Sequence, residues 1–412
     1  MKIFILALII IATFFITPVQ SQWVTSFGDF VAVEALAANG TNIIAATHNN
    51  GIYHSTNNGT NWAAASTGLP VASITYKLAF NGNDVFAVTD GNWGMYRSTN
   101  NGTLWTQSGL NGIWLTSIFI DSSNMFVGTN GNGVYLSTDN GTNWTQTNTG
   151  LGFSIGIWAF AKIGANLFAG GGSSLGEGVF MSTDNGANWT RPANTGISAQ
   201  SIKTLSVIGN NLFAGTFSNG MLLSTDHGEN WTAINSGLTN LGVKASLAVG
   251  NNLFAGTYGG GVFLSTNNGA NWSAQNTGLT YLYVTSFAIA DGKLYAGHFG
   301  VSSRPLSEMI TTSVQEIKGH NLPSNFSLEQ NYPNPFNPQT AIGFSLLAVG
   351  NVTLKVYDVL GREVATLLNN ETMQAGRHEI QFNGSTLTSG VYFYRLSVDG
   401  KFSETKKLVL MK

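Results

Sequence analysis

The sequence has no cysteine and very little charge: none of its 412 residues is Cys, and only 9% are charged. Without cysteine there are no disulfides, thiol nucleophiles or cysteine-based zinc sites. A formal net charge of −2 gives no basic field that would hold nucleic acid or an anionic membrane. Disorder does not explain the low charge, because 43% of the residues are hydrophobic. The fold must therefore depend on packing and on backbone hydrogen bonds.

The N-terminus has the pattern of an export signal. A short basic start, Met1-Lys2, precedes an uncharged and almost wholly apolar run over residues 3–16. This run is too short to cross a bilayer comfortably, which makes a transmembrane anchor the weaker interpretation. We expect residues 1–21 to be a signal peptide that is cleaved after Ser21. No later segment has about 18 uninterrupted apolar residues, so we expect no transmembrane segment in the mature chain.

The middle of the chain is a repeat. Residues 55–62 read Ser-Thr-Asn-Asn-Gly-Thr-Asn-Trp, and similar octets start at intervals of 43, 39, 45, 42 and 41 residues. They occupy residues 55–62, 98–105, 137–144, 182–189, 224–231 and 265–272. A period near 42 residues fits four short strands, which is the size of one propeller blade. In one repeat we expect strands near 246–249, 253–257, 261–265 and 272–276. A solenoid of stacked strands is the alternative.

The number of blades follows from the first two strands of the repeat. Their pattern occurs seven times, starting near residues 35, 77, 117, 159, 204, 246 and 286, whereas the octet occurs six times. Residues 22–28 resemble an outer strand without its octet. We therefore predict that they complete the seventh blade by pairing near residues 301–305, which would leave no open seam. Residues 22–307 are thus expected to form an all-β, seven-bladed β-propeller.

The octets resemble the Asp-box, or BNR repeat, of sialidase-like, photosystem II assembly-factor-like and sortilin-like propellers. The resemblance implies a turn between the third and fourth strands of each blade. The Asp or Asn would accept backbone N–H bonds, Gly would adopt a positive φ, and Trp would pack into the blade. We expect a structural role for the third residue of each octet, namely Asn57, Asn100, Asp139, Asp184, Asp226 and Asn267.

Catalytic residues are scarce in this region. A sialidase site would need three converging arginines, but residues 22–307 contain only Arg97, Arg191 and Arg304, two of them on outer strands. A glycosidase needs two carboxylates about 5–10 Å apart. Once acids in turns and octets are set aside, Asp90 and Glu177 are the weak candidates.

His48 and His298 occupy corresponding loop positions in the first and seventh blades, where they would be placed to hold a metal. Partly exposed loop histidines without a metal are the alternative. We predict neither a metal nor a cofactor.

Aromatic residues are the candidates for ligand binding. Trp93 falls in a loop between the second and third strands of its blade, whereas Trp114 and Trp158 fall in segments that lead into the first strand. Tyr258 and Tyr281 map to the same end of the blades, as do Tyr76, Phe153, Phe217 and Tyr283. Aromatic faces stack on sugars or enter partner pockets, and packing between blades is the alternative.

The C-terminal part has a different composition. Residues 326–412 are about 17% charged, against about 7% for residues 22–307. We interpret residues 308–325 as a linker. Strand patterns at regular spacing predict a small Ig-like β-sandwich over 326–412. These patterns lie at residues 340–346, 351–358, 363–368, 377–382, 390–398 and 402–410.

This segment resembles the type A sorting domain of type IX (Por) secretion. Residues 328–338 read Leu-Glu-Gln-Asn-Tyr-Pro-Asn-Pro-Phe-Asn-Pro, and residues 355–364 and 390–396 continue the pattern up to a basic end at Lys406-Lys407. The resemblance implies the type IX machinery as a partner and a secreted or outer-surface location, reached through the periplasm. It also implies a bacterium of the Bacteroidetes–Chlorobi kind. An Ig-like adhesion or spacer module is the alternative.

The sequence as a whole predicts an exported, non-catalytic propeller that binds a glycan or a protein. A secreted glycoside hydrolase of the Asp-box propeller type and a purely structural surface-layer protein are the alternatives.

Overall fold

The computed structural model describes residues 22–70, 73–152, 155–172, 178–197, 201–310, 327–346, 350–373, 376–385, 387–398 and 402–412. The expected signal peptide, Phe153, Glu177 and residues 311–325 of the expected linker lie outside these ranges. The chain divides into two compact units, Met1–Thr311 and Thr312–Lys412. In the described residues both units are built from strands, apart from one 3-10 turn at Leu306–Glu308.

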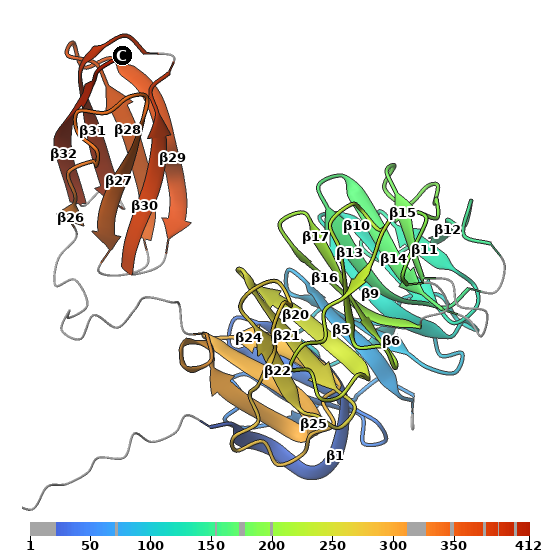
Figure 1. Ribbon diagram of the computed structural model, residues 1–412. Helices are drawn as coiled ribbons and strands as arrows, with labels where there is room; N and C mark the ends of the chain where they lie inside the picture. The colour runs from blue at the N-terminus through green and yellow to red at the C-terminus, as the bar shows by residue number, and fades with distance from the viewer. Residues whose placement is uncertain are drawn as a thin grey trace, which may run out of the picture. The chain divides into compact units, whose positions relative to one another are not determined.

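The first unit is a seven-bladed β-propeller (Figure 1). Short antiparallel strands joined by Gly- and Asn-rich turns form each blade, as the repeat predicts. In chain order, the strands are β1 (Val24–Asn39), β2 (Asn42–Thr47), β3 (Ile52–Ser55), β4 (Ala63–Ala64), β5 (Thr75–Asn81), β6 (Asp84–Thr89), β7 (Met95–Ser98), β8 (Thr106–Gln107), β9 (Leu115–Asp121), β10 (Asn124–Thr129), β11 (Val134–Ser137), β12 (Thr145–Gln146), β13 (Ile157–Ile163), β14 (Asn166–Gly171), β15 (Gly178–Ser182), β16 (Ile202–Ile208), β17 (Asn211–Thr216), β18 (Met221–Ser224), β19 (Thr232–Ala233), β20 (Val243–Val249), β21 (Asn252–Thr257), β22 (Val262–Ser265), β23 (Ser273–Ala274), β24 (Ser286–Ala290) and β25 (Lys293–Pro305).

The first strand of each blade is the innermost strand. β5, β9, β13, β16, β20 and β24 follow β1 in this role, each contacts the next, and β24 contacts β1 again. The inner strand of blade 6 is longer than expected, since it starts at Val243 rather than near residue 246. The outer strand β23 is shorter than expected and comprises only Ser273–Ala274. A β-bulge interrupts the alternating pattern at the start of the inner strand. Because of this bulge, the alternation of apolar residues does not predict the first paired residues of the strand.

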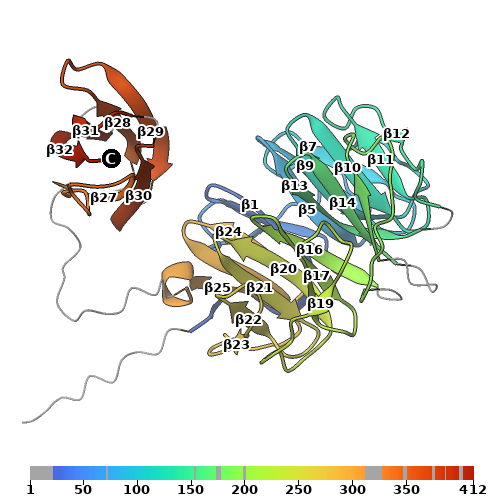
Figure 2. The ribbon, with the colours of Figure 1, turned by 45° about the horizontal axis from the view of Figure 1, so that its top comes forward.

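The ring closes as predicted through the N-terminal segment. In β1, Val24 pairs with Ser303 and Thr25 with Ser302 of β25, while the later part of β1 pairs with β2. The residues that flank β25 are hydrogen-bonded to each other, since the Leu306 N–H donates to the Gly292 carbonyl at 2.9 Å. β1 and β25 lie side by side in both ribbon views (Figure 2). One strand therefore belongs to both the first and the seventh blade.

A repeated contact links neighbouring blades. The backbone N–H of Trp189 donates to the Thr149 carbonyl of the preceding blade at 2.8 Å, and its indole N–H donates to the Thr147 carbonyl at 2.9 Å. Trp23 repeats both bonds toward blade 6, through Thr277 and Gln275. The equivalence of Trp23 to the octet tryptophans, inferred from sequence, is thus visible in its bonds.

The second unit is a small β-sandwich. One sheet has the order β26-β27-β30 and the other the order β29-β28-β31-β32. The six expected strands are present, and the two-residue β26 is an addition. Their bounds are β26 Ser327–Leu328, β27 Gln339–Leu346, β28 Gly350–Tyr357, β29 Glu363–Met373, β30 Gly376–Asn383, β31 Gly390–Val398 and β32 Phe402–Leu410. Side chains from both sheets, such as Phe344, Leu354 and Tyr394, form one buried core.

Candidate ligand-binding site on the propeller axis

The octets are turn-forming elements. The Asp139 carboxylate accepts hydrogen bonds from the Ser137 hydroxyl and the Asn143 backbone N–H, both at 2.8 Å. Asn57 accepts the equivalent bond from the Asn61 N–H at 2.9 Å, so amide and acid cap the turn alike. Hydrogen bonds from Asn143 and Ser137 lower the pKa of Asp139 to about 2. The Asn143 side-chain amide donates to the other carboxylate oxygen at 2.7 Å, so both oxygens of the acid are bonded within the turn.

A second position recurs in every blade, but the residue type at this position differs between blades. Bulges interrupt the pairing of the first two strands in blades 1 to 6, at Val33 within the long strand β1 and near the start of the inner strand in the other five blades. A bulge adds one residue to a strand and re-aims its side chain. With Thr285, which directly precedes β24, the residues at this position are Glu34, Tyr76, Thr116, Trp158, Lys203, Lys244 and Thr285.

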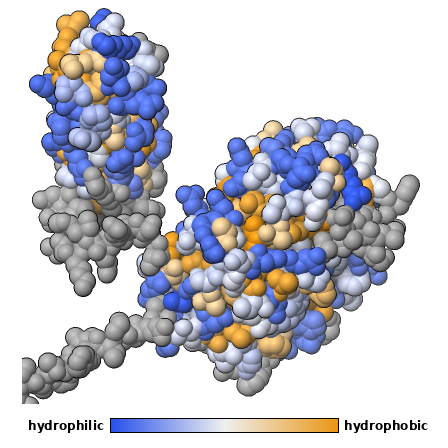
Figure 3. Space-filling view, viewed as in Figure 1, coloured by the Kyte–Doolittle hydropathy of each residue, from blue (hydrophilic) through white to orange (hydrophobic). Residues whose placement is uncertain are grey.

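These seven side chains line one cavity. It has a volume of about 140 Å³, and Lys77 and Tyr258 also line it. Because each blade contributes one residue from the start of its innermost strand, the cavity lies on the propeller axis. We call it the axial pocket. Figure 3 shows apolar residues scattered among neutral and hydrophilic ones on the propeller face in view.

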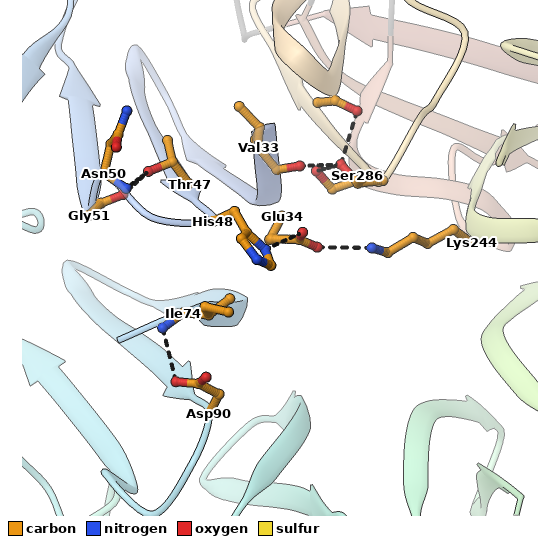
Figure 4. A network of polar contacts seen from close by, with 12 residues as sticks. Val33, Glu34, Thr47, His48, Asn50, Gly51, Ile74, Asp90, Lys244 and Ser286 are labelled. Atoms are coloured by element: carbon orange, nitrogen blue, oxygen red, sulfur yellow. Dashed lines mark hydrogen bonds and ion pairs between the residues drawn. The ribbon is translucent and has the colours of Figure 1, made fainter. Parts of the chain in front are cut away.

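One ion pair spans the axial pocket. Glu34 of blade 1 lies 2.8 Å from the Lys244 ammonium of blade 6 and 3.1 Å from the His48 Nδ1. Figure 4 shows Glu34 between these two partners. Burial opposes the ionisation of Glu34, but the charge and hydrogen bond of Lys244, with His48, keep its pKa below the usual range. Burial likewise disfavours the charged Lys244, and Glu34 more than compensates by raising its pKa.

Two further lysines have no carboxylate partner among the described residues. Burial, with the neighbouring charge of Lys244, lowers the pKa of Lys77 to about 8, although Glu34 partly opposes this shift. Burial and Lys244 also lower the pKa of Lys203. The Lys203 ammonium lies 4.3 Å from the centre of the Trp158 ring and 5.7 Å from that of Phe217. Cation–π contacts therefore take the place of an ion pair at Lys203.

An aromatic arc continues from Lys203 around the rim. Phe217 contacts Tyr258, and Tyr258 contacts Tyr283, with ring centres 5.3 and 5.4 Å apart. Tyr283 contacts Phe299, which contacts Tyr281. We define these five residues as the aromatic arc. It extends over blades 5 to 7 and adjoins the axial pocket at Tyr258.

The structure gathers only some of the predicted aromatic residues. Trp158 and Tyr258 line the axial pocket, and Tyr281 lies in the aromatic arc. Trp158 lies within β13, at its bulge, rather than in the segment before that strand. The reason is again the bulge, which extends the strand beyond its alternating part. Trp93 and Trp114 are 47% and 40% exposed and do not line the pocket.

The predicted acids and histidines do not form a site in the described residues. The Asp90 carboxylate accepts the Ile74 backbone N–H at 2.9 Å, and its suggested partner Glu177 lies outside the described ranges. His48 contacts Glu34, whereas the His298 Nε2 lies 2.7 Å from the Ser302 hydroxyl. The described part of the chain has no group of three His, Asp or Glu side chains placed to hold a metal.

Sequence reasoning missed the lysines of the axial pocket. The signal that would have found them is a triplet, repeated in six of the seven blades, in which an apolar residue, a variable residue and a small residue follow one another. Val33-Glu34-Ala35 and Val243-Lys244-Ala245 are examples. In blade 2 the third residue is Lys77, where the other blades have Ala, Ser or Thr. The repeat is recognised by the residues that recur, whereas the residue at this position varies from blade to blade.

Comparisons with known proteins agree with this architecture. Residues 330–411 match a secretion system C-terminal sorting domain, and residues 20–152 and 165–289 match the DUF6242 beta propeller domain. A search of curated proteins found no match.

Several solved structures share the fold. YCF48 from Cyanidioschyzon merolae is 14% identical with a TM-score of 0.53, covering 69% of this chain and 98% of that one. A structure of YCF48 bound to D1 peptide is 14% identical with a TM-score of 0.54, covering 69% and 96%. The Niastella koreensis GH74 enzyme is 14% identical with a TM-score of 0.53, covering 92% and 74%.

The sorting domain indicates a protein that is secreted or carried on the outer surface, with the type IX secretion machinery as its partner. In the described residues, no helix has the length and apolarity to span a membrane. The chain belongs to the DUF6242 β-propeller family, and its propeller is followed by a C-terminal sorting domain.

Proposed function

We propose that the protein is an exported, non-catalytic propeller that binds a glycan or protein ligand at the axial pocket. One observation carries the proposal: seven blades of similar design direct side chains of five different types, namely Glu, Tyr, Thr, Trp and Lys, into the same cavity. A repeated fold needs no such variety for stability, whereas a binding site needs it for specificity. Residues 1–21 would act as the signal peptide and the octets as Asp-box turns, in a chain of Bacteroidetes–Chlorobi origin.

The electrostatics of the pocket favour binding over glycoside hydrolysis. A glycosidase needs one carboxyl group that is protonated near neutral pH, with a second nearby. Glu34 is the one carboxylate among the residues that line the pocket, and Lys244 and His48 keep its pKa low. It is therefore a poor general acid. The hydrolase alternative rests on Asp90, whose carboxylate already caps a backbone N–H, and on Glu177.

The proposal is tested by comparing two double variants of the full chain. Trp158→Ala with Tyr258→Ala removes two aromatic walls of the pocket, whereas Trp93→Ala with Trp114→Ala removes two exposed aromatics outside it. Both proteins are screened on immobilised polysaccharides and peptides, and thermal unfolding verifies their folding. We expect only the first variant to lose a ligand that the unmodified protein retains. Loss in the second variant alone, or release of new reducing ends from a polysaccharide, would contradict the proposal.

A further inference from the structure

We infer that the axial pocket recognises the carboxylate of an acidic sugar, and that the ligand is a polysaccharide containing uronic acids. This inference rests on the proposed function and names its ligand class. It arises from the two lysines in the pocket that have no ion pair, and from the aromatic arc beside the pocket.

The pocket has more cationic than anionic side chains. Lys77, Lys203 and Lys244 line it together with a single carboxylate, Glu34. Lys244 forms an ion pair with that carboxylate at 2.8 Å. Among the described residues, no ion pair compensates the charge of Lys77 or Lys203. Lys77 also stands at a position where the other blades have a small side chain, so its ammonium is an addition to the repeated design. Two partly buried ammonium groups are therefore left facing one small cavity.

An anion in the pocket would offset the cost of burying these two ammonium groups. Burying an ammonium group without a counter-charge is unfavourable, and a carboxylate at hydrogen-bonding distance offsets that cost. The lowered pKa values of Lys77 and Lys203 reflect the same burial.

The size of the pocket and its rim favour a sugar acid. A cavity of about 140 Å³ is smaller than the roughly 300–1,000 Å³ of ordinary small-molecule pockets, so it accommodates an end group rather than an oligosaccharide. Phe217, which is 55% exposed, lies beside Lys203 and begins the aromatic arc. A uronic acid has a carboxylate next to the apolar C–H face of its ring, which suits a lysine next to an aromatic side chain. An acidic peptide would instead bring backbone amides onto this aromatic rim.

The experiment compares acidic oligosaccharides with their neutral esters. Tetramers of galacturonate, mannuronate and glucuronate, together with their methyl esters, are titrated calorimetrically into the full chain. We expect at least one acid to bind about 10-fold or more tightly than its ester, since a charge-assisted hydrogen bond is lost on esterification. Lys203→Gln and Lys77→Gln should each weaken binding of the acid by about 10-fold, whereas Lys203→Arg should retain it. Lys162→Gln is the matched control, because Lys162 pairs with Asp121 outside the pocket.

The outcomes separate this inference from the proposed function. Equal binding of every acid and its ester, or binding that both glutamine variants leave unchanged, overturns the inference. Should a peptide with a free C-terminal carboxylate bind in a Lys203-dependent way while no uronate binds, the sugar assignment is wrong. If Trp158→Ala with Tyr258→Ala abolishes binding of a neutral ligand that the lysine variants still bind, the proposed site stands and the inference falls. Thermal unfolding of each variant shows that lost binding does not reflect lost folding.

Discussion

At the scale of the residue, Lys77 shows how a side chain that departs from its repeat affects the fold. The pKa of Lys77 falls to about 8, chiefly through burial and also through Lys244, from a value near 10.5 in the unfolded chain. Lys77 lines the axial pocket together with the titratable residues Tyr76 and Glu34. Between these two pH values the folded state binds fewer protons than the unfolded state. Stability therefore rises with pH across this window, and the cost of the buried charge is fully present below pH 8.

Replacing Lys77 by Met keeps the aliphatic stem and removes the charge. We expect Lys77→Met to be more stable than the unmodified protein at pH 7 by about 1–3 kcal/mol, with the difference vanishing as the pH approaches 10.5. Urea unfolding at pH 7, 8, 9 and 10 measures this difference. Lys162→Met is the control, since Lys162 is ion-paired and should gain nothing. A stability difference that stays constant over this range would show that Lys77 is not the titrating group.

At the scale of the element, a glycine that follows the outer strand sets the distance between blades. A Cβ added to Gly150 would lie 1.8 Å from the Trp189 carbonyl oxygen of the next blade, and the φ of Gly150 is +91°. The same close approach recurs at Gly68, Gly196 and Gly237. The octet tryptophan can donate its backbone N–H across the blade boundary only because no side chain stands there.

We predict that Gly150→Ala is more destabilising than Gly164→Ala. Both glycines have positive φ, but a Cβ on Gly164 would meet nothing within 4 Å. The control should cost about 1 kcal/mol for its backbone conformation, and Gly150→Ala at least about 2 kcal/mol more because it must also displace a backbone carbonyl. Chemical denaturation of the two variants measures the difference. Equal costs would mean that the blades can separate enough to admit a methyl group.

The strands illustrate what the sequence could and could not predict. Period, alternation and octets placed the blades and the sandwich strands, because local propensity and fold agree there. The bulges were missed, since a bulge breaks the alternation by which a strand is found and depends on pairing with a partner. The sequence predicts Trp158 and Tyr258 from their aromatic rings alone. It does not predict Lys203 and Lys244, because a lone lysine on a strand gives no local sign of facing an axis.

At the scale of the whole molecule, the low charge has a structural counterpart. Backbone pairing and turn bonds satisfy most polar groups of the propeller, and Asn does in three octets what Asp does in the others. The lysines of the axial pocket therefore stand out in a ring with few other ionisable groups. Closure of the ring supports this arrangement, since Glu34 lies in the same strand that completes the last blade.

Ring closure should depend on Trp23, the residue that begins the last pairing. Trp23 is 2% exposed, donates its backbone N–H to the Thr277 carbonyl and packs against Phe254 and Leu264 in the core of the last blades. We expect Trp23→Ala to cost about 3–5 kcal/mol of unfolding free energy, as for other buried aromatic residues. Trp93→Ala, which removes a half-exposed tryptophan, should cost less than about 1 kcal/mol. Guanidinium unfolding gives both values, and hydrogen exchange should show faster opening of β24 and β25 in Trp23→Ala. If the two variants unfold alike, the N-terminal segment covers the seam without holding it closed.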